Sequence, residues 1–361
     1  MIEIPFDLVN GHVFVRASVN GLPADLIVDT GSSISTLSEE FAARSGVKTL
    51  DGLASAAGAA RVPVRLATVP GISLPGIELG EVIVALIGTE AVSRAAGRPV
   101  DGTVGFELFH RYAVEIDYVR QRLIAHEPGT FSPTGAVAHP VDTRTRIPLL
   151  DATIETHPGN SVPARLVVDL GSSALSLRLA RSFVEKHRDA FAGLQGVVAP
   201  IGAGVGGRLM GEVVRLHALH LGDLSVGAPT AGLARERKGA LEVGLFDGSI
   251  GAPVLAPWFA ADYSGRRIFL SREAARNARY DASGLTLTSD AGAVTVDFVA
   301  VPSPAAEAGL QPGDVIEKLD GREVTARDLH ALRSAFREPA TTRVLHVRRL
   351  GSVPIALRTL V

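Results

Sequence analysis

The chain carries one short pattern twice. The sequence LIVDTGSS at residues 26–33 returns as LVVDLGSS at residues 166–173, and each copy ends an apolar run in an aspartate, Asp29 or Asp169. A single apolar strand that leads into a polar turn arises easily by chance. Two copies in the same register indicate a duplicated half instead, with the two aspartates at equivalent places.

The correspondence continues beyond the aspartates. Each copy has a second related element downstream, DGTVG at residues 101–105 and DGSIG at residues 247–251. Later, EIDYVRQRLI at residues 115–124 is similar to AADYSGRRIF at residues 260–269. Two copies make a duplication rather than a repeat array. Short Val, Ile and Leu runs broken by Gly and Pro predict two mainly β lobes related by a pseudo-twofold axis.

Paired aspartates at equivalent strand ends point to one kind of chemistry. Two carboxylates brought together cannot both ionise cheaply, so Asp29 and Asp169 are expected to share a proton and to titrate as a pair. One carboxylate can then accept a proton from a bound water, while the other, protonated, polarises a scissile carbonyl. This chemistry requires no metal or cofactor, and we expect none.

These motifs give residues 1–272 a resemblance to the aspartic proteases of the pepsin and retropepsin group. The chain is most similar to bacterial single-chain members built from two retropepsin-like halves. The resemblance implies a bilobal acid-protease fold, catalysis by Asp29 and Asp169, and a peptide or protein substrate. Because one chain supplies both halves, we expect a monomer. The catalytic-loop support would come from Thr30, Gly31, Ser32, Leu170, Gly171 and Ser172.

The supporting glycines and serines have separate expected roles. Gly31 and Gly171 permit a tight turn and a close approach of the opposite loop. The hydroxyls of Ser32 and Ser172 are placed to hydrogen-bond a carboxylate.

Leu170 departs from the pattern of the family. The residue after each aspartate is normally Thr or Ser, whose hydroxyl bonds the opposite loop; Thr30 keeps it and Leu170 cannot. Half of the bracing between the loops should be lost, at about 1 kcal/mol net per hydrogen bond. The dyad would be loosened but not forbidden. A catalytically impaired pseudo-protease that acts as a peptide-binding adaptor is therefore the alternative.

The resemblance also implies a flap, a glycine-bearing hairpin that closes over substrate. In the second half the candidates are Gly202, Gly204 and Gly206, within the run IGAGVGGRLM, and in the first half the candidate is Gly58. Neither segment carries the tyrosine of pepsin flaps, so closure is expected to resemble the retroviral kind. An ordinary hairpin turn is the alternative.

The end of the chain resembles a PDZ domain of the type attached to bacterial envelope proteases. The resemblance rests on VPSPAAEAGLQPGDVI at residues 301–316 and on the strands and helix around it. A small α+β domain is expected. The loop formed by Gly284, Leu285, Thr286 and Leu287 resembles the one whose backbone amides bind a peptide C-terminus. The alternative is that this domain only packs against the second lobe and makes it more rigid. A third possibility is that the PDZ domain is the functional part and the lobes are a structural scaffold.

Turn-rich segments set the expected domain boundaries. The prediction is an N-terminal lobe at 1–130, a linker at 131–145, a C-terminal lobe at 146–275 and the PDZ domain at 283–361.

Composition excludes several other classes. The net charge is only −2 and basic residues are spread along the chain, so nucleic-acid binding has no electrostatic footprint. Apolar runs are strand-sized, too short to span a bilayer. No cysteine is present, which excludes thiol catalysis. No signal peptide is visible, and an exported or periplasmic protein whose leader has been removed stays open.

Overall fold

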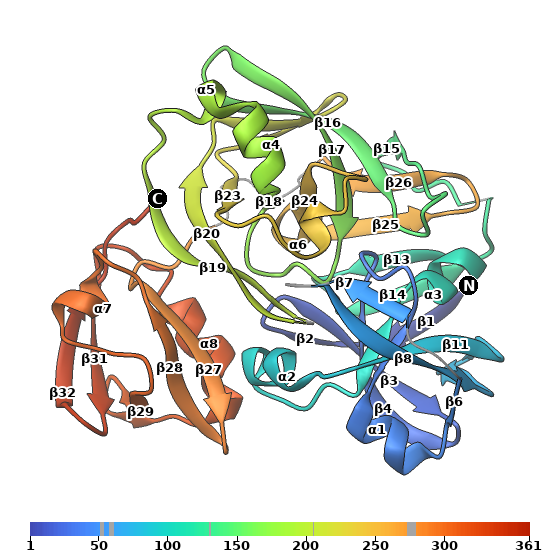
Figure 1. The fold of residues 1–361 in the computed structure, drawn as a ribbon, viewed down its shortest axis with the longest axis horizontal. Coiled ribbons are helices and arrows are strands. Elements are labelled where there is room, and N and C mark those ends of the chain that lie inside the picture. Colours follow the sequence, from blue (N-terminus) through green and yellow to red (C-terminus); the bar gives the residue numbers. More distant parts are fainter. Residues whose placement is uncertain (51–53, 58–60, 130, 205, 273–278) are drawn as a thin grey trace.

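The computed structural model describes residues 1–50, 54–57, 61–129, 131–204, 206–272 and 279–361. This part of the chain is mainly β, which confirms the predicted fold class (Figure 1). Each half of the duplication forms its own sheet, a third sheet joins the halves, and a small α+β domain follows. No helix in these ranges is long and apolar enough to cross a membrane.

The first lobe is built on an eleven-stranded sheet. Its main path is β10 (Ile77–Glu78), β9 (Ile72–Leu74), β3 (His12–Val19), β4 (Leu22–Val28), β12 (Gly102–Val104), β5 (Thr36–Ser38), β11 (Val82–Ile87), β8 (Arg61–Val69) and β6 (Lys48–Thr49), with β2 (Asp7–Val9) on β3 and β7 (Ala54–Ala57) on β8. The helices of this lobe are α1 (Glu39–Ser45), α2 (Glu90–Ala96) and α3 (Phe106–Arg111). Alternating residues of β3 are buried, as expected of a strand with one face on a core.

The second lobe has a nine-stranded sheet. Its order is β19 (Gly196–Gly204), β20 (Gly207–Arg215), β23 (Thr230–Ala234), β18 (Leu177–Leu179), β24 (Gly248–Gly251), β17 (Asn160–Asp169), β16 (Leu149–His157), β21 (Ala218–Leu221) and β22 (Leu224–Gly227). Its helices are α4 (Arg181–Lys186), α5 (Arg188–Phe191), the short 3₁₀ helix η1 (Ala240–Glu242) and α6 (Ala252–Leu255).

The two lobes repeat one arrangement around the aspartates. In the first lobe β12 runs parallel to β4 with Gly102 beside Leu26, and in the second β24 runs parallel to β17 with Gly248 beside Leu166. A Cβ on either glycine would overlap the backbone of the neighbouring strand, β5 or β18. Only glycine permits this approach, so packing explains the glycine of the DG element in each copy.

A six-stranded sheet joins the lobes. Its order is β1 (Ile2–Pro5), β14 (Arg122–His126), β13 (Ala113–Asp117), β25 (Trp258–Asp262), β26 (Arg267–Ser271) and β15 (Ala136–Pro140). The lobes meet where β13 pairs with β25. Residues 131–145, expected to be a linker, supply β15, which pairs along its whole length with β26. This segment is therefore part of the sheet rather than a plain connection.

The C-terminal domain has its own sheet and core. The sheet order is β27 (Leu285–Asp290), β28 (Ala293–Val299), β29 (Val315–Leu319), β31 (Thr342–Val347) and β32 (Gly351–Ala356), with β30 (Arg322–Glu323) on β29. The helices are α7 (Pro304–Glu307), η2 (Ala326–Asp328) and α8 (Leu329–Ala335). Leu287, Ile316, Leu332 and Phe336 lie in a core separate from that of the lobes.

This C-terminal domain is docked on both lobes. Arg208 of β20 forms an ion pair with Asp297 of β28 at 2.6 Å. Ser289 Oγ donates to a backbone carbonyl of α2, and α2 lies between the C-terminal domain and the first lobe in Figure 1. At the end of the chain, Leu360 and Val361 pack against the core of the lobes. These contacts hold the C-terminal domain against both lobes.

Candidate active site

Asp29 and Asp169 meet between the lobes. Asp29 directly follows β4, and Asp169 is the last residue of β17. An ideal Cβ built on Gly31 would lie 2.8 Å from Asp169 Oδ1, and one built on Gly171 would lie 2.8 Å from Asp29 Cγ. Each glycine thus lies against the carboxylate of the opposite lobe. The two loops therefore form one site, and a side chain at Gly31 or Gly171 would overlap the opposite carboxylate.

The two carboxylates have different partners. Asp29 Oδ1 accepts hydrogen bonds from the backbone N–H groups of both glycines, Gly31 at 2.8 Å and Gly171 at 3.1 Å. Asp169 Oδ2 instead accepts from Nη2 of Arg178, a residue of β18. The site is pseudo-symmetric in its backbone and asymmetric in its charges.

The environment of Asp29 favours its protonated form. Burial first, and the charge of Asp169 second, raise the pKa of Asp29 from 3.8 to about 7. The hydrogen bonds from Gly31 and Gly171, together with the charge of Arg178, act in the opposite direction. A dyad that holds one proton near neutral pH can supply both a base and an acid.

Thr30 braces the two loops as its type predicts. Its hydroxyl donates to the carbonyl of Val168 at 2.7 Å and accepts from the N–H of Leu170 at 3.0 Å. Thr30 is fully buried. Leu170 returns no side-chain hydrogen bond and lies 1% exposed in the core of the lobes. Hydrophobic packing therefore occupies the place of the second brace.

Leu170→Thr is expected to lower stability. The new hydroxyl would enter a dry apolar core, at a cost of roughly 1–3 kcal/mol beyond the lost packing. Chemical denaturation of the variant measures this loss. Leu22→Thr, at a position on β4 that is 38% exposed, is the matched control and should change the free energy of unfolding by less than about 0.5 kcal/mol. A stability gain in Leu170→Thr would show that a polar brace fits after all.

The hydrogen bonds of Ser32 and Ser172 lie within their own lobes, and Ser32 Oγ also lies 3.3 Å from Thr103 Oγ1. Ser32 Oγ donates to the carbonyl of Ile34 at 2.8 Å, so it braces its own loop, contrary to the expectation that it binds a carboxylate. The backbone N–H of Ser172 donates to the carbonyl oxygen of Asp169 at 3.1 Å. Both contacts shape the turn after the aspartate.

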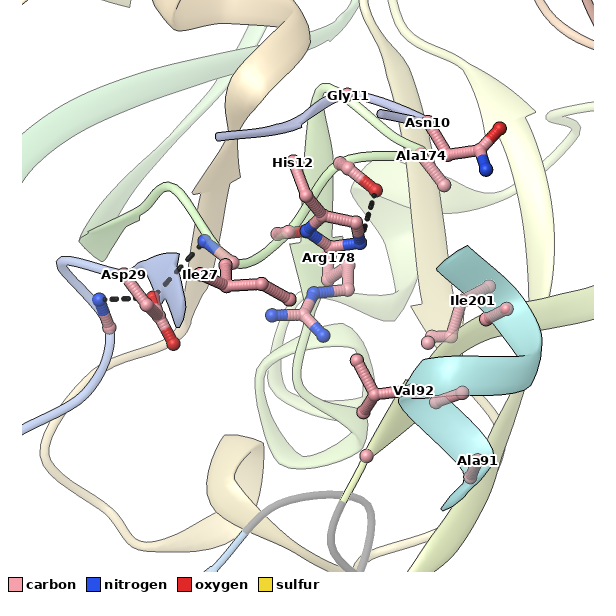
Figure 2. A pocket seen from close by; sticks show the side chains of 18 of the residues that line it. Asn10, Gly11, His12, Ile27, Asp29, Ala91, Val92, Ala174, Arg178 and Ile201 are labelled. Atoms are coloured by element: carbon pink, nitrogen blue, oxygen red, sulfur yellow. Dashed lines mark hydrogen bonds between the residues drawn. The ribbon is translucent and has the colours of Figure 1, made fainter. Parts of the chain in front are cut away.

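A cavity of about 1340 Å³ extends from the dyad to the C-terminal domain. It is lined by the catalytic loops, by α2, by the β19–β20 hairpin and by β27 and α8. Figure 2 shows Arg178 inside it, with Asp29 on one side and Val92 of α2 and Ile201 of β19 on the other. The volume is ample for several residues of an extended peptide.

The predicted second flap is an antiparallel hairpin of β19 and β20. Gly202 and Gly204 lie on β19 and line the cavity, whereas Gly206, with φ +85°, lies in the turn. An ideal Cβ on Gly202 would be 2.9 Å from Arg178 Nη1, so this glycine lets the hairpin lie close over the arginine. Gly58, the first-lobe candidate, lies outside the described residues.

The predicted peptide-binding loop of the PDZ domain is only partly free. Leu285, Thr286 and Leu287 belong to β27, the edge strand of the sheet, and they line the cavity. However, the N–H of Gly284 donates to Asp281 Oδ1 at 2.6 Å. An acidic side chain of the chain itself therefore fills part of the loop expected to bind a terminal carboxylate.

The same groove is closed by a neighbouring turn and by α8. The N–H of Leu285 donates to Ser283 Oγ at 3.1 Å, and Arg333 Nη2 donates to the carbonyl of Leu287 at 2.6 Å. A peptide that pairs with β27 would have to displace Arg333. Capture of a C-terminus by free amides at Gly284 and Leu285 does not fit these contacts.

Two residues of the cavity were missed from the sequence. The only sequence signal for Arg178 is that the equivalent residue of the first half is Thr36. His12 lies on β3, and its Nε2 is 3.1 Å from Ser173 Oγ. Burial, followed by the charges of Arg333 and Arg178, lowers the pKa of His12 to about 4. Among the described residues, no cluster of three or more His, Cys, Asp or Glu could hold a metal ion.

Comparisons with known proteins agree with this description. Residues 15–108 match the aspartyl protease family, and residues 299–349 match the PDZ domain family. The chain is also similar to the crystal structure of a retropepsin-like aspartic protease from Rickettsia conorii, with 24% sequence identity over 34% of this chain and 87% of that chain and a TM-score of 0.25. No curated protein matches the chain. The two family matches confirm the predicted aspartyl-protease resemblance at the N-terminus and the PDZ domain at the C-terminus, and the aspartyl protease match includes Asp29 but not Asp169.

Proposed function

We propose that the protein is an aspartic endopeptidase whose catalytic residues are Asp29 and Asp169. The observation that carries this proposal is the approach of each loop glycine, Gly31 and Gly171, to the carboxylate of the other lobe. Such an arrangement needs both halves of the duplication, because each carboxylate lies against the loop of the other lobe. The raised pKa of Asp29 supports a shared proton.

The proposed reaction is addition of water to a peptide carbonyl. Asp169, as carboxylate, accepts a proton from the water. At the same time the oxygen of the water forms a bond to the carbonyl carbon. Asp29 gives its proton to the carbonyl oxygen, which yields a tetrahedral diol. The proton on Asp169 then passes to the amide nitrogen, Asp29 regains a proton from the diol, and the C–N bond breaks. Both carboxyl groups return to their starting states.

The surroundings fit an extended substrate. The β19–β20 hairpin lies over the cavity, and its glycines present backbone groups to a bound chain. The edge strand β27 of the PDZ domain opens into the same cavity. A peptide that lies across the dyad would continue along β27 by strand pairing once it displaces Arg333 from the carbonyl of Leu287, rather than by capture of its terminal carboxylate.

A second function is favoured by two specific features. Leu170 lacks the hydroxyl of Thr30, and Arg178 occupies one oxygen of Asp169. Both would suit a pseudo-protease that keeps the cavity for peptide binding and has lost turnover.

Incubation with a mixture of peptides distinguishes the two functions. The products are separated from the protein and analysed by mass spectrometry between about pH 4 and pH 8, the range in which the dyad is expected to titrate. The peptidase predicts new fragments that increase with time. Intact peptides retained on the protein, with no fragments at any pH, would contradict it and support the adaptor.

A further inference from the structure

The two carboxylates of the dyad have unequal surroundings, and we propose that Arg178 fixes their roles. Arg178 is a positioning residue that holds Asp169 as the carboxylate that accepts a proton from water, and it leaves the proton of the pair on Asp29. This inference rests on the proposed peptidase function. It adds an assignment of general base and general acid, which the duplicated motifs by themselves leave equivalent.

Arg178 stands where the first lobe has a threonine. In the sheet of the second lobe it lies beside Ser249 of β24, and Thr36 lies beside Thr103 in the first lobe. Thr36 Oγ1 and Thr103 Oγ1 are hydrogen-bonded at 3.0 Å. Arg178 Nε donates to Ser249 Oγ at 3.1 Å. In both lobes, therefore, the residue at this position contacts the hydroxyl beside it on the neighbouring strand. The lobes differ in that Arg178 also has a guanidinium, which extends beyond this hydroxyl.

That extension reaches the carboxylate of Asp169. Arg178 Nη2 pairs with Asp169 Oδ2, and the two side chains are only 21% and 11% exposed. A cation in contact with a carboxylate shielded from water favours its charged form. Asp169 Oδ1 faces the opposite loop, since an ideal Cβ on Gly31 would lie 2.8 Å from it. One oxygen is thus held by the cation, and the other faces the loop that carries Asp29.

Asp29 has the complementary surroundings. Its Oδ1 accepts from the N–H groups of Gly31 and Gly171, which leaves Oδ2 to carry a proton. Within the described part of the chain, no cation pairs directly with it. Burial and the nearby charge of Asp169 raise the pKa of Asp29 to about 7. The proton of the pair is therefore retained on Asp29 up to neutral pH.

Other titratable groups near the dyad come from several elements. His12 lies on β3, Tyr263 follows β25, and Arg333 lies on α8. Burial and the charge of Arg333 lower the pKa of His12 to about 4, and burial raises that of Tyr263 well above its usual value. Both are uncharged near neutral pH. Arg178 is thus the cation in direct contact with the dyad, through Asp169.

Melting temperatures test the ion pair without any requirement for activity. Asp169→Asn is expected to lower the melting temperature by several degrees, because it leaves the guanidinium of Arg178 unpaired in a shielded place. The double variant Asp169→Asn, Arg178→Thr should melt higher than Asp169→Asn alone. Arg181→Thr, which breaks an ion pair with Glu185 on α4, is the control and should have little effect. A double variant that melts no higher than Asp169→Asn would overturn the proposal.

The pH profile of kcat/KM tests the assigned roles. Arg178→Thr reproduces the Thr36 of the first lobe. Removal of the cation makes both protonations of the pair easier, so both limbs of the profile should move to higher pH by about one unit or more. Arg178→Lys keeps a positive charge and should restore most of the wild-type profile. A change in kcat with unmoved limbs would mean a merely structural role and would overturn the proposal.

The proposal and the function on which it rests fail in different ways. If the wild type cleaves no peptide at any pH, the peptidase and the catalytic roles both fall, and the melting comparison still decides whether Arg178 holds Asp169 charged. If the wild type cleaves and Arg178→Thr keeps the same limbs, the peptidase stands and the role of Arg178 falls. Faster cleavage by Arg178→Thr at every pH would identify Arg178 as a brake and likewise overturn it.

Discussion

Asp29→Asn is expected to reduce peptide cleavage by about 10⁴-fold or more, the size of loss typical when one member of a catalytic set is removed. The amide can neither give a proton to the carbonyl oxygen nor regain one from the diol. The side chain keeps its shape, so substrate should still bind. Single-turnover kinetics on one cleavable peptide measure the loss. A residual rate within tenfold of wild type would exclude Asp29 as the acid.

The same variant should gain stability at alkaline pH. Because the folded pKa of Asp29 is raised to about 7 from 3.8, the folded protein binds the proton more tightly than the unfolded chain does. Wild-type stability therefore falls as the pH rises between these two values. Asn carries no charge, so the variant should be more stable than wild type by roughly 1–3 kcal/mol at about pH 8 and should show little gain at about pH 4. Equal differences at both pH values would contradict the raised pKa.

Gly171→Ala is expected to disable the dyad through geometry alone. The new methyl group would lie 2.8 Å from Cγ and both carboxylate oxygens of Asp29, so the two loops must move apart. A displacement of about 1 Å in a catalytic group can cost 10²-fold or more in rate. Cleavage of a defined peptide measures the effect. Gly227→Ala, where an added Cβ meets nothing within 4 Å, is the control and should cleave like wild type. Normal cleavage by Gly171→Ala would mean that the loops do not meet this closely.

The duplicated backbone could be predicted because its cause is local and visible. An apolar strand that ends in Asp-x-Gly, followed later by Asp-Gly, fixes the same strand pairs twice, Gly102 beside Leu26 and Gly248 beside Leu166. The glycine is required in each copy by the contact with the neighbouring strand. The repeated pattern therefore predicts two equivalent strand ends, with Asp29 and Asp169 at matching positions.

Features that depend on one long side chain could not be predicted. The residues around Arg178 in the sequence do not show that its guanidinium reaches Asp169. Many positions differ between the halves, so the difference between Arg178 and Thr36 does not stand out. The loop at Gly284 was expected to offer free amides, but Asp281 folds back onto it. That contact arises because Asp281 precedes the loop by only three residues, a spacing that allows an aspartate to hydrogen-bond backbone N–H groups. Such local competition is hard to infer from a family resemblance.

The most direct test of the central claim is the appearance of new peptide N-termini. Wild type, Asp29→Asn and Gly227→Ala are incubated with the same peptide mixture, and the new amino groups are labelled and identified by mass spectrometry. We predict the same set of new N-termini with wild type and Gly227→Ala, and none above background with Asp29→Asn. An identical set with Asp29→Asn, or no new N-termini with wild type at any pH, would contradict cleavage by this dyad.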